Sequence, residues 1–443
     1  MPTVLHGARV VLGVTGSIAA FKAADLASKL VQHGAVVDVV LTPEAARFVT
    51  PLTFQALTHR PVTTDLFDPR AEIAMDHVAL AARADVIVVC PATAHTLARL
   101  ALGLADDALA ATVLASRAPL VLVPAMDAQM FEHPAVQEHV ARLRARGARI
   151  VGPTEGRLAS GLVGRGRMVD VAEVVGHVRA ALGAATGDLR GVTIVVTAGG
   201  TREPLDPVRV LTNRSSGKMG YAVAEAARDR GARTILITAP TALPDPPGVE
   251  VQRVETALEM REAVLAACRE ADALVMAAAV ADYRPAAPAP HKVKKGAPTW
   301  TVDLVQTPDI LTEVGAAAPA LVRVGFAAET TDVVAAARAK LLRKGLDLIA
   351  ANDVAERGSG FGADTNRLVL VGRDGTVEEL PTLPKFEAAW LLLDRVRAML
   401  GRGRSGQEQG PGRERAPRPE QGPDHEQPPD HEQGPARGGG MPS

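Results

Sequence analysis

The sequence predicts an α/β protein with two doubly wound, parallel-sheet domains of the flavodoxin-like or Rossmann-like type. Short runs of β-branched residues alternate with Ala- and Leu-rich stretches of helical length, which is typical of repeated strand–helix–strand units. This pattern stops at a glycine-containing stretch, residues 183–187, and then starts again. Because 443 residues suffice for about two or three domains, we expect one domain at 1–187 and a second at 188–400.

The first domain is predicted from uninterrupted apolar runs. Such runs, unlike alternating ones, indicate strands that helices cover on both faces. We expect strands at residues 9–14, 36–41, 85–90, 119–123 and 148–151. Helices are expected at 94–102 and at 19–33, where Gly34 ends the pattern. In such a sheet, ligands bind at the carboxyl ends of the strands.

The second domain repeats this arrangement. We expect strands at residues 192–197, 234–238, 273–277, 321–326 and 346–350. A helix is expected at 218–230, ended by Gly231. A proline-rich stretch, 286–298, interrupts the pattern, and loops of that length inside a domain are usually functional or disordered.

The C-terminal segment, residues 401–443, differs from both domains. It holds ten Gly and eight Pro and repeats the pentapeptide Pro-Asp-His-Glu-Gln. Its apolar surface is too small to offset the entropy lost on ordering. We therefore expect a disordered tail.

Charge and composition exclude several classes of protein. The formal net charge is −1, and no block of like charge stands out, which argues against a nucleic-acid-binding surface. No apolar run approaches the roughly 20 residues of a membrane span. The N-terminus lacks a secretory pattern, so a cytoplasmic protein is expected. With only Cys90 and Cys268, a disulfide framework is ruled out, and both are expected to be buried thiols.

A glycine-containing turn follows the first expected strand. Gly13 and Gly16 allow a tight turn, Ser17 offers a hydroxyl, and the helix that follows favours an anion at its N-terminus. The spacing is not that of the dinucleotide fingerprint, which needs three glycines and a later acidic residue. Taken alone, this segment is either a phosphate loop or an ordinary strand-to-helix turn.

Three other segments accompany this loop. Cys90-Pro-Ala-Thr-Ala94 and Pro124-Ala-Met-Asp-Ala-Gln-Met-Phe131 end the next strands, and Ile73-Ala-Met-Asp-His77 precedes a helix. With them the first domain resembles the homo-oligomeric flavin-containing cysteine decarboxylases. The resemblance implies that His77 is a base acting on a substrate thiol or its neighbour; without it, His77 reads as a lone surface or core histidine. It also implies a flavin mononucleotide (FMN) site at Gly16, Ser17, Thr42, Pro91 and Thr93, with Met126 and Asp127 at the substrate.

The sequence departs from that family at two positions. Asp127 stands where the family has an asparagine that holds the substrate carboxylate. A carboxylate there repels the substrate unless it is protonated, turned away or paired. Ser160 stands where the family's clamp has a proton-donating cysteine. Because a hydroxyl is a far weaker acid than a thiol, another donor or water would have to serve the last step.

The second domain carries two glycine- and serine-rich turns in series. They are Thr197-Ala-Gly-Gly-Thr-Arg202 with its continuation to Arg209, and Leu211-Thr-Asn-Arg-Ser-Ser-Gly-Lys218. Such turns, with several cationic side chains, can hold phosphate groups. The Gly217-Lys218 pair has the wrong spacing for a Walker loop.

Further segments follow at residues 276–283, 292–295, 307–310, 325–330 and 351–353. Together with the two turns they closely resemble the phosphopantothenate–cysteine ligase half of the bifunctional coenzyme A biosynthesis proteins, and the likeness runs from about residue 5 to 400. It implies that cytidine triphosphate (CTP) activates 4'-phosphopantothenate as an acyl-cytidylate, which L-cysteine then attacks. A divalent cation such as Mg²⁺ is implied, with Asp282 as a candidate ligand.

The resemblance also assigns residues. Asn213 is expected to serve conversion of the acyl-cytidylate, and Arg209 to bind the pantothenate side. Lys292 is expected to neutralise phosphate charge. The nucleotide is expected to contact Met276, Asp282, Lys292, Thr307, Pro308, Asp309, Ile310, Phe326, Lys340 and Lys344.

The combined expectation is a homo-oligomeric, two-step enzyme: ligation, then decarboxylation to 4'-phosphopantetheine. Two alternatives stay open for the first domain, because of Asp127 and Ser160: an impaired flavin-binding scaffold, or a regulatory or oligomerisation module. A nicotinamide-dependent dehydrogenase is disfavoured by the missing fingerprint.

Overall fold

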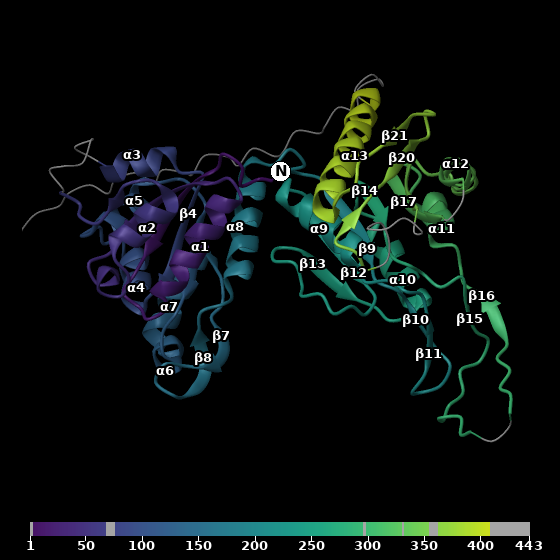
Figure 1. Ribbon diagram of the computed structural model, residues 1–443, viewed down its shortest axis with the longest axis horizontal. Helices are drawn as coiled ribbons and strands as arrows, with labels where there is room; N and C mark the ends of the chain where they lie inside the picture. Colours follow the sequence, from purple (N-terminus) through teal and green to yellow (C-terminus); the bar gives the residue numbers. More distant parts are fainter. Residues whose placement is uncertain (1–2, 68–75, 296–297, 330–331, 354–361, 408–443) are drawn as a thin grey trace, which may run out of the picture. The chain divides into compact units, whose positions relative to one another are not determined.

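The protein is described from a computed structural model, shown in Figure 1. The structure describes residues 3–67, 76–295, 298–329, 332–353 and 362–407, and the statements below concern these residues. The predicted disordered tail lies, from residue 408 on, outside the described residues. So do residues 73–75 of the predicted histidine motif and residue 330.

The first half of the chain is built on a six-stranded sheet whose strands all pair in parallel. In spatial order the strands are β3 (Val62–Thr63), β2 (Val36–Leu41), β1 (Arg9–Val14), β4 (Val86–Ala92), β5 (Leu120–Pro124) and β6 (Arg149–Ile150). The order reverses between β1 and β4, which is where a doubly wound sheet opens to receive a ligand. The prediction of a parallel sheet is confirmed for this half.

Helices cover both faces of this sheet (Figure 1). They are α1 (Ala20–Gln32), α2 (Pro51–Thr58), α3 (Asp76–Arg83), α4 (Ala94–Leu102), α5 (Ala108–Ala115), α6 (Ala128–Glu132), α7 (Pro134–Ala145) and α8 (Val171–Thr186), with a short 3₁₀ turn at Ala45–Arg47. Leu12 belongs to the core on the face of α1 and α8, whereas its neighbour Val11 belongs to the core on the face of α4 and α7. Because successive side chains point to opposite, equally buried faces, the strands are apolar throughout.

The second half has an eight-stranded sheet. In spatial order its strands are β13 (Glu250–Arg253), β12 (Arg233–Thr238), β9 (Thr193–Ala198), β14 (Ala273–Met276), β17 (Val322–Glu329), β18 (Leu348–Asp353), β20 (Val369–Gly372) and β21 (Val377–Glu379). The first six repeat the strand order of the first sheet, and the reversal falls between β9 and β14. The last two pair antiparallel and extend the predicted parallel sheet with an edge that the sequence analysis did not identify.

Five helices cover the second sheet: α9 (Lys218–Asp229), α10 (Ala257–Ala267), α11 (Ile310–Ala317), α12 (Val333–Lys344) and α13 (Lys385–Gln407). Val196 packs into the core with α9 and α13, and Val195 into the core with α10, α11 and α12. The predicted strands are all present, most with ends shifted by one to three residues. The longest shifts, of three residues, are at the ends of β17 and β18, which continue together because they pair as far as Glu329 and Asp353.

Four two-stranded ribbons stand apart from the two sheets, and none was predicted. They are β7–β8 (Thr154–Arg157 and Val163–Arg167), β10–β11 (Arg202–Pro204 and Val210–Thr212), β15–β16 (Tyr283–Pro285 and Leu304–Gln306) and β19–β22 (Thr365–Asn366 and Leu383–Pro384). The predicted proline-rich loop at 286–298 lies between β15 and β16. Each strand is too short to show an alternating pattern.

Two further expectations concern the chain as a whole. The expected boundary at residue 187 falls between α8 and β9 and stays a prediction. Among the described residues, no helix is both long and apolar enough to cross a membrane.

Candidate functional site

The turn after β1 is closely packed. Ser17 N donates to Thr15 O over 2.8 Å, and Ser17 Oγ accepts from Ala19 N over 3.3 Å. A Cβ atom on Gly16 would stand 2.4 Å from Glu44 Cβ, so the turn requires glycine there. The turn therefore presents backbone N–H groups and a hydroxyl at the sheet's carboxyl edge.

A neighbouring strand end is tied to this turn. Thr15 Oγ1 donates to Pro91 O over 2.7 Å and accepts from Thr93 N over 3.1 Å. Thr93 Oγ1 in turn accepts from Thr96 N over 3.2 Å and caps α4. The carbonyl oxygen of Pro91 thus helps to fix this turn, and the predicted contact of Pro91 with FMN stays a prediction.

A cavity of about 480 Å³ opens over these turns. Its lining includes the predicted residues Gly16, Ser17, Thr42, Thr93 and Met126. The sequence analysis missed Glu44, His95 and Arg99, which also line the cavity. Glu44 lies two residues beyond Thr42, and His95 directly follows the motif that ends at Ala94, but Arg99 lies five residues beyond that motif. No spacing pattern distinguishes these three from ordinary helical residues.

His77 lies at the start of α3, outside the set of residues that line this cavity. Its Nδ1 atom is buried and has no hydrogen-bond partner among the described residues. A buried ring nitrogen without a partner is costly. This observation is compatible with a role for His77 that a bound molecule would complete.

Asp127 and Ser160, the two departures from the family pattern, contact each other. Ser160 Oγ donates to Asp127 Oδ2 over 2.5 Å, and Asp127 Oδ1 accepts from Gln129 N over 3.2 Å, which caps α6. The ribbon β7–β8 also packs on this turn, because Met126 N donates to Gly166 O over 3.1 Å. Of the alternatives predicted for the Asp127 carboxylate, the structure has it paired.

In the second half, two glycines bring the start of α9 against the sheet. Gly217 precedes α9 with φ at 75°, a conformation that favours glycine. A Cβ atom on Gly220 would stand 2.6 Å from Thr197 O at the end of β9. The N-terminus of α9 therefore lies directly at the carboxyl edge of the sheet, as expected for a phosphate-binding turn.

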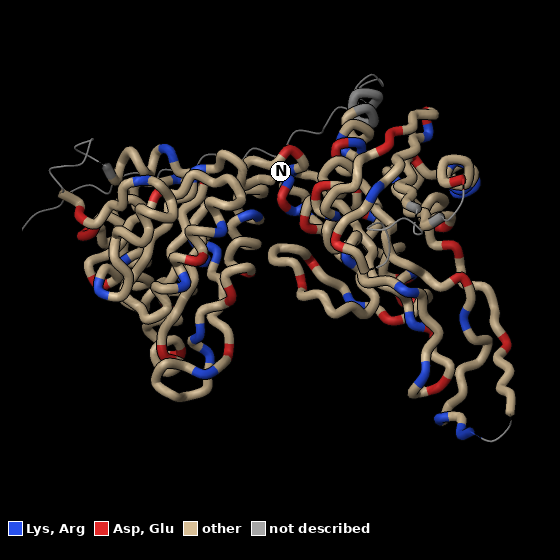
Figure 2. Tube along the Cα trace, in the orientation of Figure 1, with Lys and Arg blue, Asp and Glu red and all other residues tan. Residues whose placement is uncertain are grey.

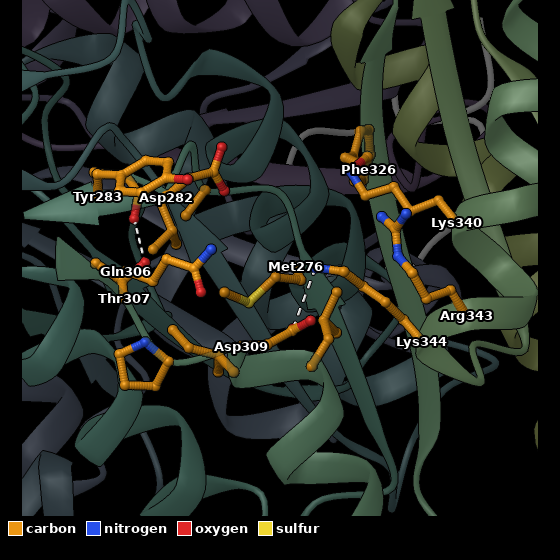
Figure 3. A pocket seen from close by; sticks show the side chains of 16 residues that line it. Met276, Asp282, Tyr283, Gln306, Thr307, Asp309, Phe326, Lys340, Arg343 and Lys344 are labelled. Carbon is orange, nitrogen blue, oxygen red and sulfur yellow. Dashed lines mark hydrogen bonds and ion pairs between the residues drawn. The ribbon is translucent and has the colours of Figure 1, made fainter.

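A cavity of about 510 Å³ lies at the carboxyl ends of β14 and β17 (Figure 3). The sequence analysis predicted nine of the residues that line it: Met276, Asp282, Thr307, Pro308, Asp309, Ile310, Phe326, Lys340 and Lys344. It missed Tyr283, Gln306 and Arg343. Figure 3 shows Lys340, Arg343 and Lys344 along one side, with Asp282 and Thr307 across from them.

Hydrogen bonds hold the walls of this cavity. Thr307 Oγ1 donates to Ala281 O over 2.6 Å, and Lys340 Nζ donates to Phe326 O over 2.9 Å. Lys344 Nζ lies 3.2 Å from Asp309 Oδ1. Burial by itself would raise the pKa of Asp309, but the attraction to Lys344 and the hydrogen bonds from Lys344 and Thr312 together keep that pKa below its usual value. Three cationic groups, Lys340, Arg343 and Lys344, line the cavity with two carboxylates, Asp282 and Asp309. The excess of positive charge suits a polyphosphate.

A second cavity, of about 490 Å³, adjoins the first, and both are lined by Ala278, Val280, Asp282, Phe326 and Lys340. Asn213 lines it, and its Nδ2 donates to Val280 O over 3.2 Å. The sequence analysis missed Lys385, a buried lysine at the start of α13 that also lines this cavity. Burial, followed by repulsion from Lys218, lowers the pKa of Lys385.

Two predicted residues line neither cavity within the described part of the chain. Arg209 forms an ion pair with Asp206, and Lys292 is exposed in the loop between β15 and β16. Their predicted roles stay predictions.

The structure offers little for a metal held by protein alone. The described ranges contain no group of three or more His, Cys, Asp or Glu side chains placed to hold a metal ion. Asp282, the candidate metal ligand, therefore belongs to no such group among the described residues. Both cysteines are buried free thiols, as predicted.

Fold and cavities together define an α/β protein with two doubly wound sheets, each with a cavity at the carboxyl ends of its strands. Family models agree: "Flavoprotein" matches residues 2–183, and "DNA/pantothenate metabolism flavoprotein C-terminal domain" matches 189–400. The coenzyme A biosynthesis bifunctional protein CoaBC of Bacillus subtilis is 45% identical over 397 residues, which cover 89% of this chain and 98% of the relative. The chain belongs to the family of bifunctional coenzyme A biosynthesis proteins.

Solved structures are similar to this chain over part of its length. The C-terminal domain of a coenzyme A biosynthesis bifunctional protein CoaBC is 41% identical, covers 48% of this chain and 97% of its own, and has a TM-score of 0.42. A PPC decarboxylase mutant complexed with pantothenoylaminoethenethiol is 30% identical, covers 39% of this chain and 97% of its own, and has a TM-score of 0.36.

Proposed function

We propose that this chain makes 4'-phosphopantetheine in two steps, a CTP-dependent ligation of 4'-phosphopantothenate to cysteine and an FMN-dependent decarboxylation. Membership of the family makes it a bifunctional enzyme of coenzyme A biosynthesis, with a decarboxylase and a ligase activity. The proposal adds the co-substrates, the cofactor and the residues. The observation that carries it is the pair of adjoining cavities in the second half, one cationic and one lined by Asn213.

The ligation starts from an unreactive group. A free carboxylate is a poor electrophile, so its oxygen must first attack the α-phosphorus of CTP, which forms an acyl-cytidylate and releases pyrophosphate. Lys340, Arg343 and Lys344 line the cavity that would hold the triphosphate and would stabilise the charge on the leaving pyrophosphate. Asp282, Phe326 and Lys340, which are among the residues that line both cavities, mark where the carboxylate would meet the nucleotide.

The second half-reaction needs an oriented acyl group. The amine of cysteine attacks the acyl carbon, an amide forms, a proton leaves the nitrogen, and cytidine monophosphate departs. Asn213 Nδ2 donates to the carbonyl oxygens of Ala279 and Val280, over 3.4 and 3.2 Å. These bonds join the segment that precedes α9 to the segment that follows β14, and both segments line this cavity. We assign Asn213 the positioning of the acyl-cytidylate for this attack.

A divalent cation enters this scheme with the nucleotide. Mg²⁺ is commonly bound through one carboxylate and substrate phosphates rather than by an all-protein cage. Asp282 is the carboxylate available for such an arrangement, in keeping with the lack of a metal cluster among the residues described.

The decarboxylase belongs to the first half. The glycine turn at Gly16, the hydroxyls of Ser17, Thr42 and Thr93, and Arg99 suit a phosphorylated flavin. FMN, when bound, supplies the oxidising equivalent at the thiol-bearing carbon of the substrate that allows carbon dioxide to leave. His77 would accept a proton at its buried Nδ1 or through its other ring nitrogen.

One contact favours a second candidate, an active ligase joined to an impaired decarboxylase. Asp127 keeps a carboxylate where relatives of the decarboxylase type hold the substrate with an amide, and Ser160 is engaged with it over 2.5 Å. Carbon dioxide release from phosphopantothenoylcysteine by the purified protein decides between the two. Release at a rate matching amide formation supports the two-step enzyme; its absence, with amide formation intact, supports the second candidate.

The ligase is tested with an Asn213→Asp variant. We expect pyrophosphate release from CTP and 4'-phosphopantothenate to continue, while amide yield falls about tenfold or more because the lost N–H donor no longer orients the intermediate. Gln252→Glu, the same chemical change on exposed β13, is the control. If the Asn213 variant forms the amide at an unchanged rate, the role assigned to Asn213 is wrong. If the unaltered protein releases no pyrophosphate, the proposed ligase activity is wrong.

A further inference from the structure

Asp206 is a carboxylate with no exposed side-chain surface, in the turn between β10 and β11. Its Oδ1 accepts from Val208 N over 2.8 Å and from Arg209 N over 2.9 Å. Its Oδ2 accepts from Arg209 Nε over 3.0 Å, and Arg209 Nη2 completes the ion pair. These donors, led by the guanidinium, hold the pKa of Asp206 well below its usual range.

The same two side chains bind a segment far away in sequence. Asp206 Oδ2 accepts from Val293 N over 3.2 Å, and Arg209 Nη2 donates to Val293 O over 2.8 Å. Both backbone polar groups of Val293 are therefore bound by Asp206 and Arg209. A further bond, from Ala289 N to Leu205 O over 3.0 Å, joins the loop to the same turn.

Arg209 has a third partner. Its guanidinium carbon lies 4.4 Å from the centre of the Trp300 ring, a cation–π contact. Val293 and Trp300 both belong to the connection between β15 and β16. One guanidinium thus binds this connection at two points, with a carboxylate that fixes its orientation.

The residue next to Val293 is Lys292. Two further lysines, Lys294 and Lys295, follow it, and Figure 2 shows positively charged residues gathered at the far end of this connection. Lys292 is exposed, and it is not among the residues that line either cavity in the described part of the chain. If this long, proline-containing connection were not held here, Lys292 would occupy many different positions. Its effective concentration at the nucleotide would then be lower.

We propose that Asp206, Arg209 and Trp300 form a clasp that positions Lys292 for the activation of the carboxylate by CTP. The clasp acts by holding the backbone of Val293, so Asp206 and Trp300 are positioning residues that touch neither substrate nor nucleotide. The inference rests on the proposed ligase function and extends it to residues outside both cavities.

The proposal assigns different consequences to the two half-reactions. Losing the clasp lowers the rate of acyl-cytidylate formation, measured as pyrophosphate release, by about tenfold or more. The reaction of preformed acyl-cytidylate with cysteine needs no triphosphate, so its rate stays unchanged. A residue needed only for folding would lower both rates together.

The test uses the full chain with Asp206→Asn and, separately, Trp300→Leu, which removes the ring without altering the β10–β11 turn. Trypsin cleavage after Lys294 and Lys295, followed by fragment mass, reports whether the connection is held. Asp245→Asn is the matched control, because it breaks another bidentate pair, between Asp245 and Arg253, on the surface of the same half.

We expect faster cleavage and slower pyrophosphate release in both clasp variants, and wild-type behaviour in the control. Cleavage that is unchanged in both, or equal losses in the two half-reactions, would overturn the clasp. If the unaltered protein releases no pyrophosphate, the ligase function fails. In that case the trypsin comparison still shows whether the clasp holds the connection between β15 and β16. The proposed positioning of Lys292 for the ligation would then be wrong as well.

Discussion

His77 lies at the start of α3, and its buried Nδ1 atom has no hydrogen-bond partner among the residues that the structure describes. If it is the base of the decarboxylation, His77→Asn removes the proton acceptor and abolishes carbon dioxide release from phosphopantothenoylcysteine. Pyrophosphate release in the second half is expected to survive. His59→Asn is the control, since His59 is exposed and has φ at 55°, which asparagine tolerates. Loss of both activities in the His77 variant would contradict the division of labour.

The Asp127–Ser160 hydrogen bond permits a second prediction at this scale. Asp127→Asn keeps the cap on α6 and a partner for Ser160 but removes a negative charge, so we expect the KM for phosphopantothenoylcysteine to fall about tenfold. Ser160→Ala leaves an oxygen of Asp127 without its donor and is expected to raise that KM.

The two changes are expected to be coupled, because they remove one shared contact. A double-mutant cycle measured on KM is expected to show a coupling energy of about 1 kcal/mol. Strictly additive effects would mean that the two side chains do not meet in the working enzyme.

At the scale of elements, the ribbon β7–β8 depends on close backbone approach to the turn before α6. A Cβ atom on Gly166 would stand 2.2 Å from Met126 O. Gly166→Ala is therefore expected to displace the ribbon and lower carbon dioxide release about tenfold or more, with the ligase unaffected. Gly161→Asn at the ribbon tip is the control, because a Cβ there meets nothing within 4 Å. Equal activity of both variants would show that the ribbon plays no part.

Helix α8 carries a histidine whose titration affects stability. Burial, followed by repulsion from Arg149 and Arg228, lowers the pKa of His177 from 6.5 to about 4. Between these values the unfolded chain binds a proton that the folded protein does not, so stability rises with pH in this window. The contribution is complete above pH 6.5 and is lost as the pH falls toward 4.

His177→Gln is expected to flatten this part of the stability profile. Urea midpoints measured from pH 4.5 to 7.5, followed by near-ultraviolet circular dichroism, give the comparison. His291→Gln, at an exposed position, is expected to leave the profile unchanged. An identical slope in the wild type and the His177 variant would rule out this histidine as its source.

For the whole molecule, the two proposed sites imply an intermediate, phosphopantothenoylcysteine, that one half makes and the other consumes. Neither the His77→Asn nor the Asn213→Asp full chain is expected to make appreciable 4'-phosphopantetheine from 4'-phosphopantothenate. Mixing the two is expected to restore production, because the intermediate passes through solution. Restored product, measured by mass spectrometry, supports two independent sites; no restoration would mean that the intermediate is not released.

Much of the fold was predictable because strands that are buried on both faces are apolar over consecutive residues, and the sequence shows such runs directly. β1 and β2 begin and end at the predicted residues, since an uninterrupted apolar run next to a glycine turn defines a strand without distant information. β20 was missed although the apolar run at 368–371 and the turn residues Asp374-Gly375 after it are local signs of a hairpin. β21 has three residues, which is too few to show a pattern. β17 was predicted too short because its last residues are held by pairing with β18.

The candidate site was predictable to the extent that it lies at strand ends. Nine residues predicted for the nucleotide line one cavity, because parallel strands bring their carboxyl ends to one edge of the sheet. Tyr283, Gln306 and Arg343 were missed although each adjoins a predicted residue, since tyrosine, glutamine or arginine at such a position is ordinary surface chemistry. Lys385 was missed because a single lysine at a helix start carries no sign of burial.

The amino-acid sequence by itself determined the two sheets, the glycine turns at their carboxyl edges and the family. These depend on residue type and on spacing over a few positions, which set backbone conformation and burial. Only the tertiary structure decided which distant side chains meet, such as Ser160 with Asp127, or Asp206 with Val293, 87 positions away. Such contacts arise from the packing of whole elements against one another, and that packing is distributed over the core rather than recorded at the residues that touch.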